Sequence, residues 1–168
     1  MQIGLITDTH NNVEGIKKAC DIFRKNNIKL IIHTGDLTSA SILRHFYGFK
    51  VYFVCGNCDY DITNISQEIG KLNGKFFEKF GEFDLDNKKI AIIHGNDEVL
   101  FNKLVESQKY DFVIHGHNHQ KEKSLYLKTN VICSGSIKAY ELNSVAILDL
   151  ERSTVNFIDI PWKKKKSS

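Results

Sequence analysis

Proline is almost absent from this sequence, which has 168 residues and a single proline, Pro161. That proline follows the last predicted strand, and the chain shows no linker, internal repeat or low-complexity segment. A chain of this length can bury a core without disulfides or metal ions. We therefore expect a single domain over residues 1–162, followed by a basic tail over residues 163–168.

Long hydrophobic runs are also missing, since no stretch approaches the ~20 apolar residues that cross a bilayer. Met1 leads directly into a predicted strand, without the basic region or cleavage site of a signal peptide. The four cysteines lack the spacing of a secreted disulfide framework. These absences predict a cytoplasmic protein without a membrane partner.

A strong charge of either sign is absent too, because the net charge is only +3. The one basic run, Lys163–Lys166, is typical of a solvated tail. The rest of the chain lacks the combined basic and aromatic pattern of a nucleic-acid surface. We therefore do not expect nucleic acid as a partner.

The first third of the chain alternates strands with helices. Three buried strands are predicted over residues 2–7, 30–33 and 51–55. Asn11 or Asn12 caps the first helix between them, and Ser39 or Ser41 begins the second. A third helix is predicted from Ile62 to near Gly74. This alternation predicts parallel strands with right-handed crossovers.

The remainder is mostly strand, interrupted by a helix over residues 98–108. The strands are predicted over residues 75–80, 82–85, 89–93, 111–115, 124–127, 130–133, 144–150 and 154–160. Short connections such as Gly81 and Asp86-Asn87 indicate antiparallel pairing. We expect a second, largely antiparallel sheet packed face to face on the first, with helices outside.

Five polar fragments each follow a predicted strand. They are Asp8-Thr9-His10, Gly35-Asp36, Gly56-Asn57, His94-Gly95 and Gly116-His117-Asn118-His119. Ligands of α/β sheets bind at the carboxyl ends of parallel strands, so we expect the fragments to meet at one edge. On an extended strand, Asp8 and His10 would point to the same side.

The donor types in these fragments indicate a metal centre. Carboxylate, amide and imidazole groups suit Mn, Fe, Zn or Ni, and a carboxylate such as that of Asp36 can bridge two cations. Any one of these residues alone is usually a turn or structural residue, but five fragments in succession are not explained that way. The sequence therefore predicts a two-metal site with seven ligands: Asp8, His10, Asp36, Asn57, His94, His117 and His119.

The order of these fragments, with the form Gly56-Asn57-Cys58-Asp59, resembles the calcineurin-like metallophosphoesterase family. The short chain and the cysteine are similar to its small YfcE-like phosphodiesterase branch. The resemblance covers residues 2 to about 150. It implies an α/β fold: a four-layer α/β/β/α sandwich of two mixed β-sheets flanked by helices.

The resemblance also implies how two divalent transition-metal ions are held in each chain. One ion would be bound by Asp8, His10, Asp36 and His119, and the other by Asp36, Asn57, His94 and His117. Mn²⁺ is the first candidate, with Ni²⁺, Fe²⁺ or Zn²⁺ as alternatives. A metal-bridging water, with Asp36 as the bridging ligand, would then attack a small phosphodiester.

Cys58 departs from the larger relatives, which carry a histidine thought to stabilise the transition state or protonate the leaving group. A thiol with a pKa near ~8.5 is a poor proton donor to an alkoxide, which favours diesters over monoesters. Cys58, Asp59, His33 and His115 are expected beside the ligands, and Asp59 either orients the site or is a turn residue. Gly135 and Ser136 stand where relatives carry Asn-Pro-Gly-Ser and are expected to face the phosphate.

Other functions stay open. The same fold serves as a non-catalytic interaction scaffold in a retromer subunit that has lost ligands, and the same site could act as a phosphomonoesterase or a nuclease. Cys55 and Cys58 also form a Cys-x-x-Cys motif, although Asn57 between them is assigned to the metal. A homodimer or tetramer is possible, with four phenylalanines forming either an interface or core: Phe76, Phe77, Phe80 and Phe83.

Overall fold

The computed structural model describes residues 1–139 and 142–161, so the predicted basic tail, residues 163–168, lies outside the described residues. The first of its two sheets has six strands, in the order β11-β10-β1-β2-β3-β4. Their bounds are Gln2–Ile6 (β1), Leu30–His33 (β2), Lys50–Val54 (β3), Lys75–Phe77 (β4), Asn143–Asp149 (β10) and Thr154–Ile160 (β11). The strands β1 to β4 are parallel, as the alternation with helices predicted for the first three.

The second sheet has five strands, in the order β5-β6-β7-β9-β8. Their bounds are Phe80–Leu85 (β5), Lys88–Ile93 (β6), Phe112–His115 (β7), Lys121–Tyr126 (β8) and Thr129–Ser134 (β9). β6, β7 and β9 are parallel to one another, and β5 and β8 pair antiparallel at the two edges. The expectation of a largely antiparallel second sheet was therefore wrong in detail, although both sheets are mixed as the fold class predicted.

Two segments expected in the second sheet, the strand β4 and the hairpin β10–β11, belong to the first sheet instead. β4 does not pair with β5 but runs parallel to β3, because α2 (Ile62–Lys71) returns the chain to that edge. Gly74 permits this return, since an added Cβ would lie 2.0 Å from the carbonyl oxygen of Val51 in β3. The hairpin β10–β11 extends the free edge of β1 in the first sheet.

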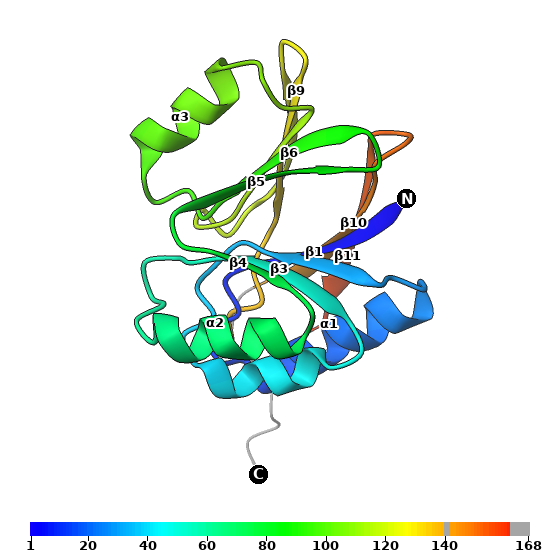
Figure 1. The fold of residues 1–168 in the computed structure, drawn as a ribbon. Helices are drawn as coiled ribbons and strands as arrows, with labels where there is room; N and C mark the ends of the chain where they lie inside the picture. Colours follow the sequence, from blue (N-terminus) through cyan, green and yellow to red (C-terminus); the bar gives the residue numbers. More distant parts are fainter. Residues whose placement is uncertain (140–141, 162–168) are drawn as a thin grey trace.

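Helices cover the two outer faces. α1 (Val13–Lys25), α2 and the 3-10 helix η1 (Ala40–Phe46) pack on the first sheet, and α3 (Glu98–Glu106) packs on the second. Figure 1 shows α1 and α2 along one side of the molecule and α3 on the opposite side. Asn12 caps α1 by accepting from the N–H of Gly15. The second helix, predicted to begin at Ser39 or Ser41, is present as the 3-10 helix η1. Among the described residues, no helix is long and apolar enough to cross a membrane.

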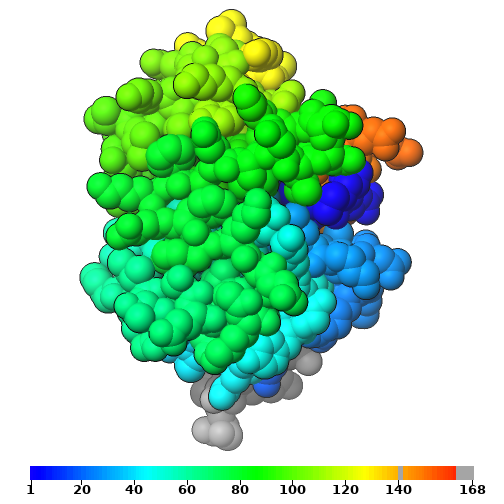
Figure 2. Space-filling view, in the orientation of Figure 1, coloured from blue at the N-terminus to red at the C-terminus, as the bar shows by residue number. Residues whose placement is uncertain are grey.

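One hydrophobic core lies between the two sheets. It contains Ile3 and Leu5 from β1, Ile90 and Ile92 from β6, and Phe83 from β5. Of the four phenylalanines predicted to form an interface or core, Phe83 belongs to the core at 8% exposure, whereas Phe80 lies at the surface at 38% exposure. The segment from α2 through β4 to β5 connects the layers and appears in Figure 2 as a continuous green surface. This four-layer arrangement confirms the predicted α/β sandwich.

Candidate metal centre

All five polar fragments lie at the carboxyl ends of strands from both sheets. In the first sheet, Asp8 and His10 follow β1, Asp36 follows β2 and Asn57 follows β3. In the second sheet, His94 follows β6, and His117 and His119 follow β7. The carboxyl ends of these five strands meet, which brings together side chains up to 111 residues apart along the sequence.

Four short distances define the centre. The Nε2 atom of His119 lies 3.2 Å from Oδ1 of Asp8, and the Nε2 atom of His10 lies 3.9 Å from the same oxygen. Asp36 lies between two imidazoles, with Oδ2 3.5 Å from Nε2 of His10 and Oδ1 3.4 Å from Nε2 of His94. Donor atoms of Asp8, His10 and His119 form one cluster of potential ligands, and those of Asp8, Asp36 and His94 form another. Asp36 therefore has the position expected of a bridging carboxylate.

His117 and Asn57 lie at the more exposed side of this centre. The ring of His117 makes an edge contact with the ring of His94, with centroids 5.1 Å apart, and its backbone N–H donates to Oδ2 of Asp8. Asn57 is exposed, and its amide nitrogen donates to Sγ of Cys58 over 3.5 Å. Both residues adjoin the centre, and His117 does not belong to the tight clusters of histidine, cysteine and carboxylate donors found among the described residues.

Left-handed backbone conformations place most of the candidate ligands. Positive φ values occur at five of the seven: Asp8, His10, Asp36, His117 and His119. Such conformations cost non-glycine residues about 1–3 kcal/mol each and gather at functional sites. The extended, period-two geometry predicted for Asp8 and His10 after the first strand was therefore wrong, because β1 ends at Ile6 and a left-handed turn directs both side chains.

Buried atoms at the centre fit a cation. Within the described part of the chain, Asp8 Oδ1, His10 Nε2 and His94 Nε2 are buried and make no hydrogen bond. Leaving a buried polar atom unpaired costs about 1–3 kcal/mol, so three such atoms at one centre indicate a ligand that joins them. The donor set of carboxylates and imidazoles matches a divalent transition metal.

Hydrogen bonds behind the ligands fix their orientation. Nδ1 of His94 donates to the carbonyl oxygen of Thr34 over 2.7 Å, which leaves the Nε2 lone pair facing Asp36. The hydroxyl of Thr7 donates to Oδ2 of Asp8 over 2.7 Å, which leaves Oδ1 for other partners. The sequence did not single out Thr7 or Thr34, because a threonine and a main-chain carbonyl carry no recognisable pattern.

Asp59 connects two of the ligand loops. Its buried carboxylate accepts 2.8 Å hydrogen bonds from the backbone N–H groups of Asp36, Thr38 and Gly56. Gly56 itself lies so close to Asp36 that an added Cβ would be 2.2 Å from Oδ1. These contacts favour the orienting role over the turn role among the two alternatives for Asp59.

His33 and His115 lie beside the ligands without joining their clusters. His33 is buried, accepts from the N–H of Gly35 at Nδ1 and contacts the hydroxyl of Thr9 at Nε2. Burial lowers the pKa of His33 to about 3, so the ring is neutral and supports the loop between β2 and Asp36. His115 faces Glu122, with 3.3 Å between Nε2 and Oε2, and packs against the ring of Phe101.

The segment with Gly135 and Ser136 lies behind the centre. Ser136 is fully buried, and the next residue, Ile137, donates its N–H to the carbonyl oxygen of Asp8. Gly135 has a φ of +100°, and an added Cβ would lie 2.0 Å from Oγ of Ser144. This burial gives the two residues a supporting position, and their predicted contact with phosphate is left as a prediction.

Charges at the centre shift its pKa values. Burial by itself would raise the pKa of Asp36, but the His94 imidazole and the N–H of Cys58 outweigh it and hold the pKa well below its usual range. Burial lowers the pKa of His10, against the pull of Asp36 and Asp8. Burial, and to a smaller extent the negative charge of the neighbouring Asp36, raises the pKa of the Cys58 thiol to about 11. Asp36 is therefore a carboxylate, and the free thiol is protonated near neutral pH.

An open cavity of about 300 Å³ adjoins the centre on the side of the second sheet. Its walls combine an aromatic ring, amides and carboxylates with two of the histidines: Gly95, Glu98, Phe101, Asn102, His115, Gly116, His117, Asn118 and Glu122. The segment 96–102 supplies three of these side chains, Glu98, Phe101 and Asn102. Glu122 comes from β8, and no sequence motif marked it as a residue near the site.

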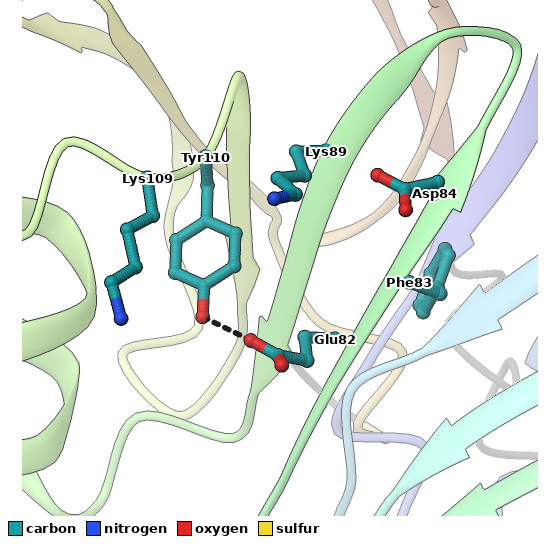
Figure 3. A pocket seen from close by; sticks show the side chains of 6 residues that line it. All are labelled: Glu82, Phe83, Asp84, Lys89, Lys109 and Tyr110. Carbon is teal, nitrogen blue, oxygen red and sulfur yellow. Dashed lines mark hydrogen bonds between the residues drawn. The ribbon is translucent and has the colours of Figure 1, made fainter.

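A larger cavity, of about 390 Å³, lies away from the metal centre. Figure 3 shows its lining, in which Tyr110 donates to Glu82 over 2.6 Å and Lys89 lies on β6. β6 runs from Lys88 towards His94, so Lys89 is at the opposite end of that strand from the candidate ligands. This cavity therefore adds no residue to the metal centre.

Comparison with known proteins agrees with this geometry. The family model of the calcineurin-like phosphoesterase superfamily domain matches residues 1–153. Phosphodiesterase MJ0936 of Methanocaldococcus jannaschii is 28% identical over 157 residues, which covers 90% of this chain and 95% of that protein.

Two solved structures share the fold. The structure of an archaeal phosphodiesterase has a TM-score of 0.90 and 27% identity, and the match covers 95% of this chain and all of that one. The phosphoesterase YfcE of E. coli has a TM-score of 0.69 over 96% of this chain and all of that one, and at 15% identity it supports the fold alone. The family model and the match to the archaeal phosphodiesterases confirm the predicted class of enzyme, a phosphoester hydrolase, and the chain belongs to the calcineurin-like phosphoesterase superfamily.

Proposed function

We propose that this protein is a dinuclear-metal phosphodiesterase that hydrolyses small phosphodiesters. The observation that carries the proposal is the meeting of Asp8, His10, Asp36, His94 and His119 at the carboxyl ends of strands from two sheets, with Asp36 between two imidazoles. The relative named a phosphodiesterase, which this chain matches over 90% of its length, supports the same reaction.

Two divalent ions would supply an activated bridging water as the nucleophile and neutralise charge on the phosphate. Asp8, His10, Asp36 and His119 would hold one ion, and Asp36, Asn57, His94 and His117 the other. Mn²⁺ is our first choice, and Ni²⁺, Fe²⁺ and Zn²⁺ also suit these donors. The proposal keeps the predicted cytoplasmic location.

The surrounding residues prepare the site before substrate arrives. Asp59 fixes the loops of Asp36 and Gly56, and the Thr34 carbonyl fixes the ring of His94, so the donors need little rearrangement. The cavity beside His117 has room for one arm of a diester, with the ring of Phe101 as its apolar wall. Cys58 does not supply a good proton donor, because burial and the neighbouring carboxylates disfavour its thiolate. A diester with a good leaving group needs no such donor.

The test is hydrolysis of bis-nitrophenyl phosphate and nitrophenyl phosphate by metal-free protein reconstituted with each metal. We expect Mn²⁺ or Ni²⁺ to give diester hydrolysis that EDTA abolishes, and Asp36→Ala or His94→Ala to remove it. His45→Ala is the control, because His45 lies on η1 outside the clusters of potential ligands. Full activity of Asp36→Ala would refute the two-metal mechanism. Metal binding without turnover of either ester would favour the interaction scaffold, and faster monoester turnover would favour a phosphomonoesterase.

A further inference from the structure

Cys58 lies among the candidate ligands. Its Sγ atom, a ring nitrogen of His10 and a carboxylate oxygen of Asp36 are all within 4.8 Å of one another. Two donors bound to one ion at about 2.0–2.3 Å cannot be more than ~4.6 Å apart. Since no pair of these atoms is more than 4.8 Å apart, none exceeds that limit by more than a few tenths of an ångström, and side-chain adjustment would let one ion contact all three.

The backbone holds Cys58 firmly in this position. Its N–H donates to Oδ1 of Asp36 over 2.8 Å, and the next residue, Asp59, accepts from the N–H groups of Asp36 and Gly56. The side-chain nitrogen Nδ2 of Asn57 donates to Sγ of Cys58 over 3.5 Å. The backbone of Cys58 is therefore anchored to the proposed bridging carboxylate, and its sulfur contacts the side chain of Asn57, another proposed ligand.

Two buried atoms independently indicate that a cation belongs at this centre. Asp8 is 0% exposed and His94 is 1% exposed, and within the described residues Asp8 Oδ1 and His94 Nε2 make no hydrogen bond. Asp8 Oδ1 lies 3.9 Å from the same His10 nitrogen that lies 3.5 Å from Asp36. These unpaired atoms thus lie beside His10 and Asp36, the two residues whose donor atoms cluster with the sulfur of Cys58.

The other cysteines have different surroundings. Cys20 and Cys133 are buried in the hydrophobic core at 1% and 0% exposure, and burial raises the pKa of each to about 12. Cys55 is partly buried, packs against the core of the first sheet and belongs to none of the clusters of potential ligands among the described residues. Cys58 alone of the four joins a histidine and an aspartate in such a cluster.

We propose that Cys58 is an additional, sulfur ligand of the metal position formed by His10 and Asp36. The inference rests on the metal site of the proposed function and goes beyond its seven oxygen and nitrogen ligands. On coordination, the S–H bond breaks, the proton passes to solvent and the sulfur forms a bond to the cation. A thiolate favours Zn²⁺, Co²⁺ or Fe²⁺ over Mn²⁺ or Mg²⁺, so this position would select a softer ion than the second one.

The experiment titrates the metal-free full-length protein with Co²⁺ under anaerobic conditions and records its absorption. We expect visible ligand-field bands and a near-ultraviolet sulfur-to-cobalt charge-transfer band in the unmodified protein and in Cys55→Ser. In Cys58→Ser and Cys58→Ala the ligand-field bands should remain and the charge-transfer band should disappear. The preference for Zn²⁺ over Mn²⁺ in competition should also fall at least tenfold in both Cys58 variants.

The unmodified protein alone can overturn the proposal, whether or not the variants fold. Ligand-field bands without a charge-transfer band would show that the metal site exists but that Cys58 is not a ligand. A charge-transfer band that persists in Cys58→Ser would assign the sulfur to another cysteine. Absence of both bands would overturn this inference together with the metal site, whereas loss of hydrolysis with both bands intact would count against the proposed reaction only.

Discussion

Replacing Asp59 with asparagine is expected to loosen the metal centre without removing any proposed ligand. The Asp59 carboxylate is 5% exposed and accepts from three backbone N–H groups, with Oδ2 serving Asp36 and Gly56 and Oδ1 serving Thr38. An asparagine side chain has one oxygen in place of two. It can keep the two bonds to Asp36 and Gly56, but its NH₂ group must then face the N–H of Thr38.

The expected loss follows from this geometry. A hydrogen bond to a charged group contributes about 1.5–3 kcal/mol, and the two surviving bonds lose their charge assistance. We therefore expect Asp59→Asn to lower the free energy of unfolding by about 2–4 kcal/mol. Asp59→Ala should cost more, because three buried N–H groups then lack an acceptor. Misplacement of Asp36 should also weaken metal binding about 10- to 100-fold.

Urea unfolding and calorimetric metal titration would measure the two effects. With an m value of ~2 kcal/mol/M, the unfolding midpoint should fall by about 1–2 M. Asp61→Asn is the control, because Asp61 is exposed and its carboxylate accepts hydrogen bonds only from the side chain of Asn64 among the described residues. An Asp59→Asn variant with unchanged midpoint and unchanged metal affinity would refute the orienting role of Asp59.

Three other predictions address packing, substrate and metal. Gly56→Ala should abolish tight metal binding, because the new Cβ would lie 2.2 Å from Oδ1 of Asp36. The control Gly70→Ala in α2 has open space and should stabilise the fold by up to about 1 kcal/mol. Equal metal affinities of the two variants by calorimetry would contradict this prediction. Phe101→Ala should raise KM for nitrophenyl diesters at least threefold with a smaller change in kcat, because Phe101 lines the cavity. Val99 is 80% exposed, so the control Val99→Ala should leave steady-state kinetics unchanged. An unaltered KM in Phe101→Ala would show that the cavity is not part of the substrate site. Metal at about 100 times its Kd should add about 2.7 kcal/mol of stability, which corresponds to a rise in Tm of roughly 5–11 °C that EDTA reverses; a Tm insensitive to metal would argue against binding to the folded chain.

The sequence by itself determined the elements and the chemistry of the site. Strand ends are local features, so the apolar runs before Asp8, Asp36 and His94 were enough to place these residues at one edge. Donor chemistry is a property of the residue type, and the motif order was enough to identify the superfamily. Both depend on the side chains themselves or on their neighbours in the chain.

The tertiary structure decided which strands pair and how the donors face one another. β4 joined β3, and the β10–β11 hairpin joined β1, because pairing depends on contacts between distant segments that strand propensity does not encode. The left-handed turns at Asp8 and His10 replaced the predicted extended geometry, because surrounding contacts can stabilise strained backbone that local preference disfavours. The three N–H groups on Asp59 and the sulfur of Cys58 beside His10 likewise exist only where separate loops meet in space.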